Sequence, residues 1–472
     1  MATTSAIRRW AILTILVTGM LNALGVRAAE QVGEARKAYP PVPAAKDPQQ
    51  LGLGIQQTMT LLATSTPEHR NKVRILFYGQ SITEQDWWKR VAEDLRKRFP
   101  YADLEIENRA IGGFASQLLI RPAEHDLYPF YPDLLIFHVY GANQQYEEII
   151  RNVRMRTTAE ILMQKDHVTK WPQETPDEKA DKGMWWDYMM NHVFLPEIAK
   201  KYGCGVCDVR SGWMDYLKTN KLEPKDLLRD GVHLNDQGCY LMAELIKQYL
   251  VYRPELPKDS WQGMMRTLEV GKDIAWKDGK LTVEFEGNRV DVLAGKLEGA
   301  TATARVLIDG KKPSEFAGCY RITRPAPGPW SPLFVSRVDH EKPLVLEDWT
   351  LKITAVDSES KRWSFNVTGS VTGPDGSGSN EQVFVSKSGR VKIDPAAFFK
   401  AGNVPVGYEC KWKVLPMFVD IYATPKVEEA SREYATTLAQ GLANGTHRLE
   451  IISANGKNVP IRAIRVYCPP VR

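Results

Sequence analysis

Ser81 follows a run of mostly apolar residues and comes directly after Gly79 and Gln80. Residues 73–78 are rich in β-formers, which predicts a buried strand, and residues 85–99 have the pattern of an amphipathic helix. A serine at the turn between a parallel strand and a helix lies at the rim of the sheet, where α/β enzymes bind their ligands. Its hydroxyl could therefore act as a nucleophile. A serine that only caps the helix would occupy the same position.

Three further segments carry residues that could complete a catalytic site with this serine. Gly113 lies five residues after Asn108, at the end of a predicted strand, and Asn143 follows another predicted strand. Asp230 precedes His233 by three residues in a loop that leads into a predicted helix. Because the carboxyl ends of parallel strands meet at one edge of a sheet, these segments are expected to converge on the serine.

The residue types suit acyl transfer from an ester. The hydroxyl of Ser81 is a poor nucleophile until a base removes its proton, and His233 can do this near neutral pH. Asp230 would hold the imidazole in the required tautomer and stabilise the imidazolium. Backbone N–H groups of Ser81 and Gly113 and the side-chain amide of Asn143 could bind the developing oxyanion. Each residue also has a structural reading, as a turn glycine, a helix cap or a buried histidine.

In this order the four segments resemble the characteristic blocks of the SGNH (GDSL-type) hydrolases, over residues 70–252. The resemblance implies a flavodoxin-like α/β domain of three layers with a parallel sheet, and it implies neither a metal nor a cofactor. The residues that it assigns are Ser81, Asp230 and His233 as the catalytic triad, and Ser81, Gly113 and Asn143 as the oxyanion hole.

Two positions depart from the family's pattern. Gln80 stands where the family usually has Asp before the serine, and Gln144 stands where Asp often follows the asparagine. Neither position is catalytic in the family, so activity is still expected. Both departures leave the substrate open.

Short apolar runs alternate with helical patterns through the first region, which predicts a parallel sheet with helices on both faces. His138 lies inside one of the predicted strands, where a core histidine is expected rather than a substrate contact. The predicted strands are residues 73–78, 103–108, 134–140 and 205–209, and the predicted helices are residues 85–99, 146–162, 184–202 and 236–252.

Beyond Pro254 the pattern changes to short alternating strands separated by turn signals such as Asn455-Gly456. This pattern is typical of an antiparallel β-sandwich. Residues 304–310 and 438–452 resemble parts of the jelly-roll module that accompanies some carbohydrate esterases of the same family. The resemblance does not explain residues 311–430.

Aromatic residues of this second region could stack on sugar rings. Tryptophans at alternating strand positions more often fill the core of a sandwich, and that interpretation is favoured here. The candidates are Trp330, Trp349, Trp363, Trp412 and Tyr408.

The N-terminus is typical of a signal peptide, with Arg8 and Arg9 before an apolar stretch at 10–24 and small residues that suit cleavage after Ala28 or Ala29. An uncleaved anchor is the alternative, although the stretch is short for a membrane span. No later segment is long and apolar enough to cross a bilayer, so a secreted or periplasmic protein is predicted. The expected organisation is a signal peptide at 1–29, a surface lead-in at 30–69, the hydrolase domain at 70–252 and the β-sandwich domain at 253–472.

Net charge bears on the binding partners, and the cysteines bear on redox and metal chemistry. The net charge of +5 includes three arginines and no acidic residue within residues 1–29, and the weakly basic remainder gives no argument for a nucleic-acid partner. Cys204 and Cys207 have the spacing of a redox or zinc motif. A strand over residues 205–209 would hold their thiols apart, which favours buried thiols. The oligomeric state is left open.

Three functions remain from the sequence. The first is a secreted serine esterase that removes O-acetyl or similar acyl groups from a polysaccharide through an acyl-enzyme. The second is a lipid-directed esterase or thioesterase, which predicts an apolar patch around Ser81. The third is a catalytically silent glycan-binding protein, in which Ser81, His233 and Asp230 would not assemble.

Overall fold

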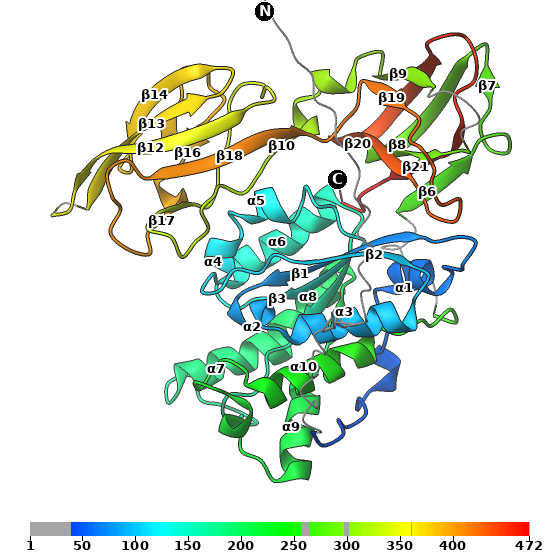
Figure 1. Ribbon diagram of the computed structural model, residues 1–472. Helices are drawn as coiled ribbons and strands as arrows, with labels where there is room; N and C mark the ends of the chain where they lie inside the picture. Colours follow the sequence, from blue (N-terminus) through cyan, green and yellow to red (C-terminus); the bar gives the residue numbers. More distant parts are fainter. Residues whose placement is uncertain (1–38, 257–263, 297–301, 360, 472) are drawn as a thin grey trace, which may run out of the picture. The chain divides into compact units, whose positions relative to one another are not determined.

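The computed structural model describes residues 39–256, 264–296, 302–359 and 361–471 (Figure 1). The expected signal peptide at residues 1–29 lies outside the described residues. In the part of the chain that the structure describes, no helix is both long enough and apolar enough to cross a membrane.

The first region contains a five-stranded sheet in which all neighbouring strands are parallel, in the order β2-β1-β3-β4-β5. This is the strand order of flavodoxin-like folds, so the predicted fold class is confirmed. The strands are β1 (Lys72–Gly79), β2 (Asp103–Asn108), β3 (Leu134–His138), β4 (Glu160–Gln164) and β5 (Gly205–Cys207).

Helices cover both faces of this sheet (Figure 1). Alternate side chains of β1 point to opposite faces: Ile75 and Phe77 join one hydrophobic core, and Leu76 and Tyr78 join the other. A strand buried on both faces explains the continuous apolar run before the serine. The helices are α1 (Gln56–Ala63), α2 (Ser81–Glu84), α3 (Trp87–Arg98), α4 (Ser116–Leu119), α5 (Ala123–Asp126), α6 (Asn143–Arg156), α7 (Lys182–Met189), α8 (Leu195–Tyr202), α9 (Val209–Asn220) and α10 (Asp236–Tyr249).

The strand β4 corrects the sequence analysis, which predicted one helix over residues 146–162. The helix α6 ends at Arg156, and Thr157 already has an extended backbone. The five residues of β4 are all buried. Apolar residues at the end of the helix and in the strand form one continuous pattern, because a fully buried strand lacks the alternation that distinguishes it from a helix.

The helix α1 corrects the expectation that residues 30–69 lie on the surface. Ile55, Met59 and Leu62 are buried in the core that also contains Ile75 and Phe77. Their spacing of four and three residues is that of the apolar face of a helix. That signal was present in the sequence, within a segment that is otherwise polar.

Glu160 connects α1 to the sheet. Its carboxylate accepts hydrogen bonds from the backbone N–H groups of Gln57 at 2.8 Å and Thr58 at 2.7 Å. Ile55, which precedes α1, provides no side-chain cap, so Glu160 satisfies N–H groups that would otherwise lack partners. Burial nevertheless raises the pKa of Glu160 to about 7.

Replacing Glu160 by glutamine is expected to change how stability depends on pH. The ordinary pKa is near 4.5, so between about pH 4.5 and 7 the folded protein keeps a proton that the unfolded chain releases. Wild-type stability should therefore fall by about 3 kcal/mol as the pH rises through this window. Glu160→Gln removes this contribution. Urea unfolding at pH 5 and 7.5 gives the free energy of unfolding of both proteins. If the wild type and the variant differ by the same amount at both pH values, the prediction is contradicted.

The second region consists of antiparallel strands with two separate hydrophobic cores. One sheet has the order β19-β9-β20-β8-β21-β6, with β7 beside β8, and another has the order β10-β18-β12-β13-β14. Two two-stranded sheets, β11-β17 and β15-β16, complete the region. The antiparallel architecture confirms the class predicted for this region.

The two resembling stretches lie together in the first of these sheets, where Leu449 pairs with Ile308. Much of the unexplained stretch between them forms the second sheet, which contributes its own core. The strands of the region are β6 (Met265–Glu269), β7 (Trp276–Lys277), β8 (Lys280–Ala294), β9 (Thr303–Ile308), β10 (Tyr320–Ile322), β11 (Phe334–Val335), β12 (Asp348–Asp357), β13 (Arg362–Gly369), β14 (Gly373–Ser379), β15 (Phe384–Val385), β16 (Lys392–Ile393), β17 (Phe398–Phe399), β18 (Glu409–Pro416), β19 (Ile421–Ala423), β20 (Ala435–Ser453) and β21 (Ile461–Tyr467).

The cysteines of the described residues are free thiols. Cys207 is buried in β5 and Cys204 is partly buried just before it. Burial raises the pKa of both thiols, which keeps them protonated and unreactive. The buried-thiol interpretation of this pair is thus confirmed for Cys207.

Candidate active site

Ser81 is the first residue of α2 and lies at the carboxyl end of β1. The turn depends on Gly79, because a Cβ there would lie 1.9 Å from the carbonyl oxygen of His138 on the neighbouring strand. The helix is capped by Gln80, whose side chain accepts from the backbone N–H of Ile82. The capping role considered for Ser81 is therefore performed by its neighbour, which leaves the serine hydroxyl available for other partners.

Ser81, His233 and Asp230 form a continuous chain of hydrogen bonds. The Nε2 atom of His233 lies 3.0 Å from the Oγ atom of Ser81. On the other side of the imidazole ring, Nδ1 lies 2.9 and 3.0 Å from the two carboxylate oxygens of Asp230. This is the geometry in which a histidine can remove the proton of a serine while a carboxylate fixes its tautomer.

The carboxylate of Asp230 is held by its own loop. It accepts the backbone N–H of His233 at 2.8 Å and that of Val232 at 3.3 Å. These hydrogen bonds, together with the histidine side chain, lower the pKa of Asp230 to about 2. The group is consequently ionised at any pH at which the histidine could act as a base.

Two residues hold this loop in place, and sequence reasoning missed both of them. The side-chain amide of Gln85 donates to the carbonyl of Leu234 at 2.9 Å and accepts its N–H at 3.0 Å. The Nε2 atom of His167 lies 2.8 Å from the carbonyl oxygen of Val232, and burial lowers the pKa of His167 to about 4, so its neutral ring donates this hydrogen bond. Both contacts join segments far apart in the chain, so no local pattern could have revealed them.

Gln80 also contacts Ser81 directly. Its Oε1 atom lies 2.8 Å from the Oγ atom of Ser81, which places a second acceptor beside the hydroxyl. A hydroxyl has a single proton, so it donates either to Gln80 or to His233. The departure from the family's pattern at this position therefore lies within the site itself.

The oxyanion-hole candidates lie at the same rim of the sheet. A Cβ on Gly112 would lie 3.6 Å from the Cβ of Ser81, so the loop after β2 runs directly beside the serine. Gly113 has a φ of +74°, which favours glycine. Asn143 is an exposed residue at the start of α6, after the strand that adjoins β1. Gln144 follows it in the first turn of α6 and is also exposed.

His138 is a core histidine, as predicted. Only 2% of its surface is exposed, and its Nε2 atom is hydrogen-bonded to Asp166. His125, which also lies near the site in sequence, is buried against the second region. Its ring nitrogens lie 3.1 Å from the carbonyl oxygen of Ile322 and 3.1 Å from the backbone nitrogen of Val338.

A cavity of about 380 Å³ is lined by Gln80 and Val232, the chain neighbours of Ser81 and His233, but not by the triad residues themselves. Its lining combines aromatic and apolar side chains with polar and charged ones, a mixture that suits a ligand with both apolar faces and hydrogen-bonding groups. Residues that line it include Gln80, Tyr140, Asp166, His167, Trp186 and Val232.

The tryptophans of the second region divide into two kinds. Trp349, Trp363 and Trp412 are buried in one hydrophobic core, as the favoured interpretation predicted, and Tyr408 packs against that core. Trp330 differs, because 64% of its surface is exposed.

No family model and no curated protein sequence matches the chain. Solved structures that are similar to the chain include two carbohydrate-directed esterases and a GDSL-like lipase. A two-domain esterase active on acetylated mannans has 15% identity and a TM-score of 0.34, covering 90% of this chain and 100% of that chain. An acetylxylan esterase from Geobacillus stearothermophilus has 17% identity and a TM-score of 0.33, covering 39% of this chain and 97% of that chain. A putative GDSL-like lipase from Parabacteroides merdae has 18% identity and a TM-score of 0.32, covering 39% of this chain and 98% of that chain.

Proposed function

We propose that the protein is a serine esterase with Ser81 as the nucleophile, His233 as the base and Asp230 as its partner. The observation that carries the proposal is the unbroken chain of hydrogen bonds from Asp230 through His233 to Ser81. A catalytically silent glycan-binding protein would have no need of this arrangement.

The reaction follows from the positions of these atoms. As the Oγ atom of Ser81 attacks the ester carbonyl, His233 takes the hydroxyl proton, and the carbonyl oxygen becomes an oxyanion. The N–H groups of Ser81 and Gly113 and the amide of Asn143 are the donors proposed for that oxyanion. Collapse of the intermediate releases the alcohol, which takes the proton from His233 and leaves an acyl-serine. Water, deprotonated by His233, then attacks the acyl-serine; the carboxylic acid leaves, and the Oγ atom takes the proton back from His233.

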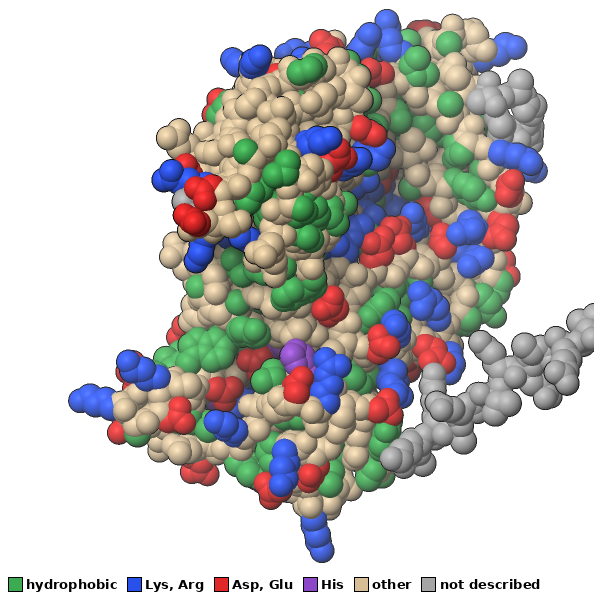
Figure 2. Space-filling model, turned by 60° about the vertical axis from the view of Figure 1, so that its left-hand side comes forward, with side chains coloured by type: hydrophobic (Ala, Val, Ile, Leu, Met, Phe, Trp, Pro, Cys, Tyr) green, Lys and Arg blue, Asp and Glu red, His purple; other side chains and the backbone are tan. Residues whose placement is uncertain are grey.

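The substrate class that we propose is an acylated carbohydrate, with O-acetyl groups on a polysaccharide as the first choice. The mixed polar and aromatic lining of the cavity supports this class, because sugars present hydroxyl groups and apolar ring faces together. Figure 2 shows one face of the molecule on which hydrophobic side chains lie in small groups among basic and acidic ones. A lipid-directed enzyme would favour a broad apolar surface instead. Export from the cytoplasm, based on residues 1–29, belongs to the same proposal.

Labelling and product analysis test this function. Diethyl p-nitrophenyl phosphate should inactivate the hydrolysis of p-nitrophenyl acetate with one phosphoryl group bound per chain, located on the peptide that contains Ser81 by mass spectrometry. Ser65, whose hydroxyl bonds to the Leu61 carbonyl at the end of α1, serves as an internal control that should stay unmodified. Acetate release from acetylated polysaccharides is expected. Turnover of long-chain acyl lipids alone would reject the carbohydrate substrate.

A further inference from the structure

The exposed side chain of Trp330 lies against the loop beside the proposed nucleophile, although it belongs to the second region. Its ring atoms Cη2 and Cζ2 lie 3.1 Å or less from the position that a Cβ would take on Gly113. Gly112, the preceding residue, lies directly beside Ser81. The indole therefore covers the loop whose N–H group is a candidate oxyanion donor.

Aromatic packing holds this indole in place. Its ring is perpendicular to that of Phe399, with centroids 6.0 Å apart. The ring centroids of Phe399 and Phe114 lie 5.0 Å apart, and Phe114 is a buried residue next to Gly113. The same cluster includes Phe334, which lies 6.1 Å from Phe114 and joins the core of the first region.

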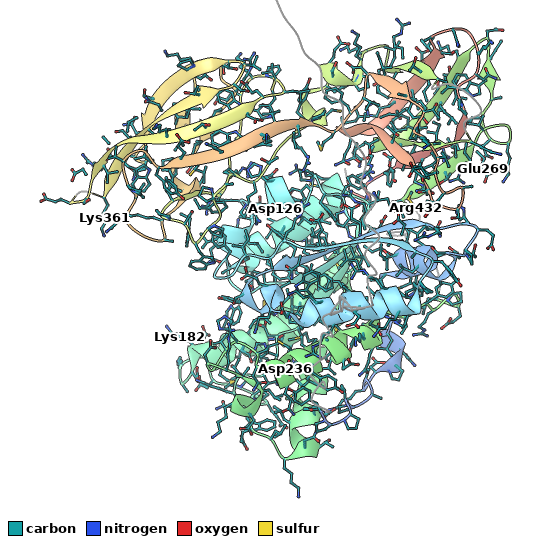
Figure 3. The ribbon with its side chains drawn as sticks, in the orientation of Figure 1. Asp126, Lys182, Asp236, Glu269, Lys361 and Arg432 are labelled. Carbon is teal, nitrogen blue, oxygen red and sulfur yellow. The ribbon has the colours of Figure 1, made fainter. Side chains whose placement is uncertain are left out.

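The loop that carries the indole is anchored at both ends. At its start, the guanidinium of Arg324 lies 3.0 Å from the carboxylate of Asp126, which Figure 3 labels on α5. Ala326 exchanges two backbone hydrogen bonds with Lys411 of β18. At its end, Leu333 is fully buried in the hydrophobic core of the second sheet. The ring is thus placed before any ligand arrives, which reduces the entropy lost on binding.

We propose that Trp330 is a stacking platform for a sugar ring on the alcohol side of the scissile ester. This role rests on the proposed esterase function, and the group that the second region would bind is a sugar of the substrate. The face of an indole ring is electron-rich and attracts the polarised C–H groups that a pyranose presents on one face. The ring is open to solvent rather than enclosed, so the bound sugar can be one unit of a longer chain.

Gly113 explains why the platform can lie so near the chemistry. A side chain at this position would collide with the indole, and the positive φ already favours glycine there. The missing Cβ lets the indole edge approach the loop that binds the oxyanion. A sugar stacked on the ring then holds its acylated hydroxyl within reach of Ser81.

The test compares two esters that share an acyl group and differ in the alcohol. We expect Trp330→Ala to lower kcat/KM for acetylated xylotetraose by about 30-fold, the size typical of a truncated aromatic anchor. Hydrolysis of p-nitrophenyl acetate, whose small alcohol does not need the platform, should change less than about 2-fold on the same reasoning. Trp330→Phe keeps an aromatic ring, so it should lose less kcat/KM for the oligosaccharide ester than Trp330→Ala does. It also replaces the alanine variant in the test if that variant does not fold.

Tyr101→Ala is the matched control. Tyr101 is 46% exposed and precedes β2, so it lies at the amino end of the parallel sheet, away from Ser81. An unchanged kcat/KM for the oligosaccharide ester in folded Trp330 variants would overturn the platform. Equal losses for both esters would also overturn it, because they would show that the indole only supports the Gly113 loop. Failure of the wild type on p-nitrophenyl acetate would instead refute the esterase function itself.

Discussion

Replacing Ser81 by alanine is expected to lower kcat for p-nitrophenyl acetate by at least about 10,000-fold. The proposed mechanism forms a covalent bond to the Oγ atom of this residue, and no other hydroxyl is hydrogen-bonded to His233 among the described contacts. The residual rate would come from water activated by the histidine and from the oxyanion donors.

The fold should survive this change. The hydroxyl of Ser81 bonds to Gln80 and His233 at a partly exposed position, so its loss should alter the free energy of unfolding by about 1 kcal/mol or less. Ser65→Ala is the matched control, since it removes a serine hydroxyl far from the triad in the fold. Circular dichroism and urea unfolding report on the fold. Full esterase activity in the Ser81→Ala protein would exclude the serine mechanism.

Replacing Asp230 by asparagine is expected to lower kcat by about 1,000-fold to 10,000-fold. The asparagine oxygen can still accept the backbone N–H of His233, so the loop should persist. Its NH2 group would face Nδ1 of the histidine and favour the tautomer whose Nε2 carries a proton. That tautomer cannot accept the proton of Ser81.

In the wild type, the carboxylate of Asp230 should act on His233 throughout the ordinary range of pH. The pKa of Asp230 is about 2, so its carboxylate is ionised above that value and its contribution is lost only as the pH falls through about 2. Arg229→Gln is the control: its side chain is 61% exposed and lies 3.7 Å from the Asp230 carboxylate, and such a surface pair should change kcat less than about 3-fold. Near-normal turnover by Asp230→Asn would show that the aspartate does not orient the base.

Local patterns were sufficient for much of the first region. The strand that ends before Ser81 is visible because burial on both faces requires a continuous apolar run. Asp230 and His233 lie three residues apart in one loop, so their contact is itself local. The order of these segments along the chain then predicted one rim of a parallel sheet, and the structure has that sheet.

Other features were missed, either because their partners are distant in sequence or because the local pattern fits two structures. The helix α1 is capped by Glu160, a residue about a hundred positions away, and β4 was merged with the preceding helix because a buried strand has no distinguishing period. The contacts of Gln85 and His167 with the loop of Asp230 and His233 likewise join separate segments. Residue type alone does not indicate such partners.

The sequence by itself pointed to Ser81, His233 and Asp230, which the structure brings together, since the proposed chemistry needs particular residue types at particular strand ends. The tertiary structure decided what surrounds them. Trp330 was a candidate for sugar stacking together with Trp349 and Trp412, and the structure leaves Trp330 exposed beside Gly113 while the other two fill a core. The environment of a side chain depends on which segments fold against it, and that information lies in the whole chain rather than in its neighbours.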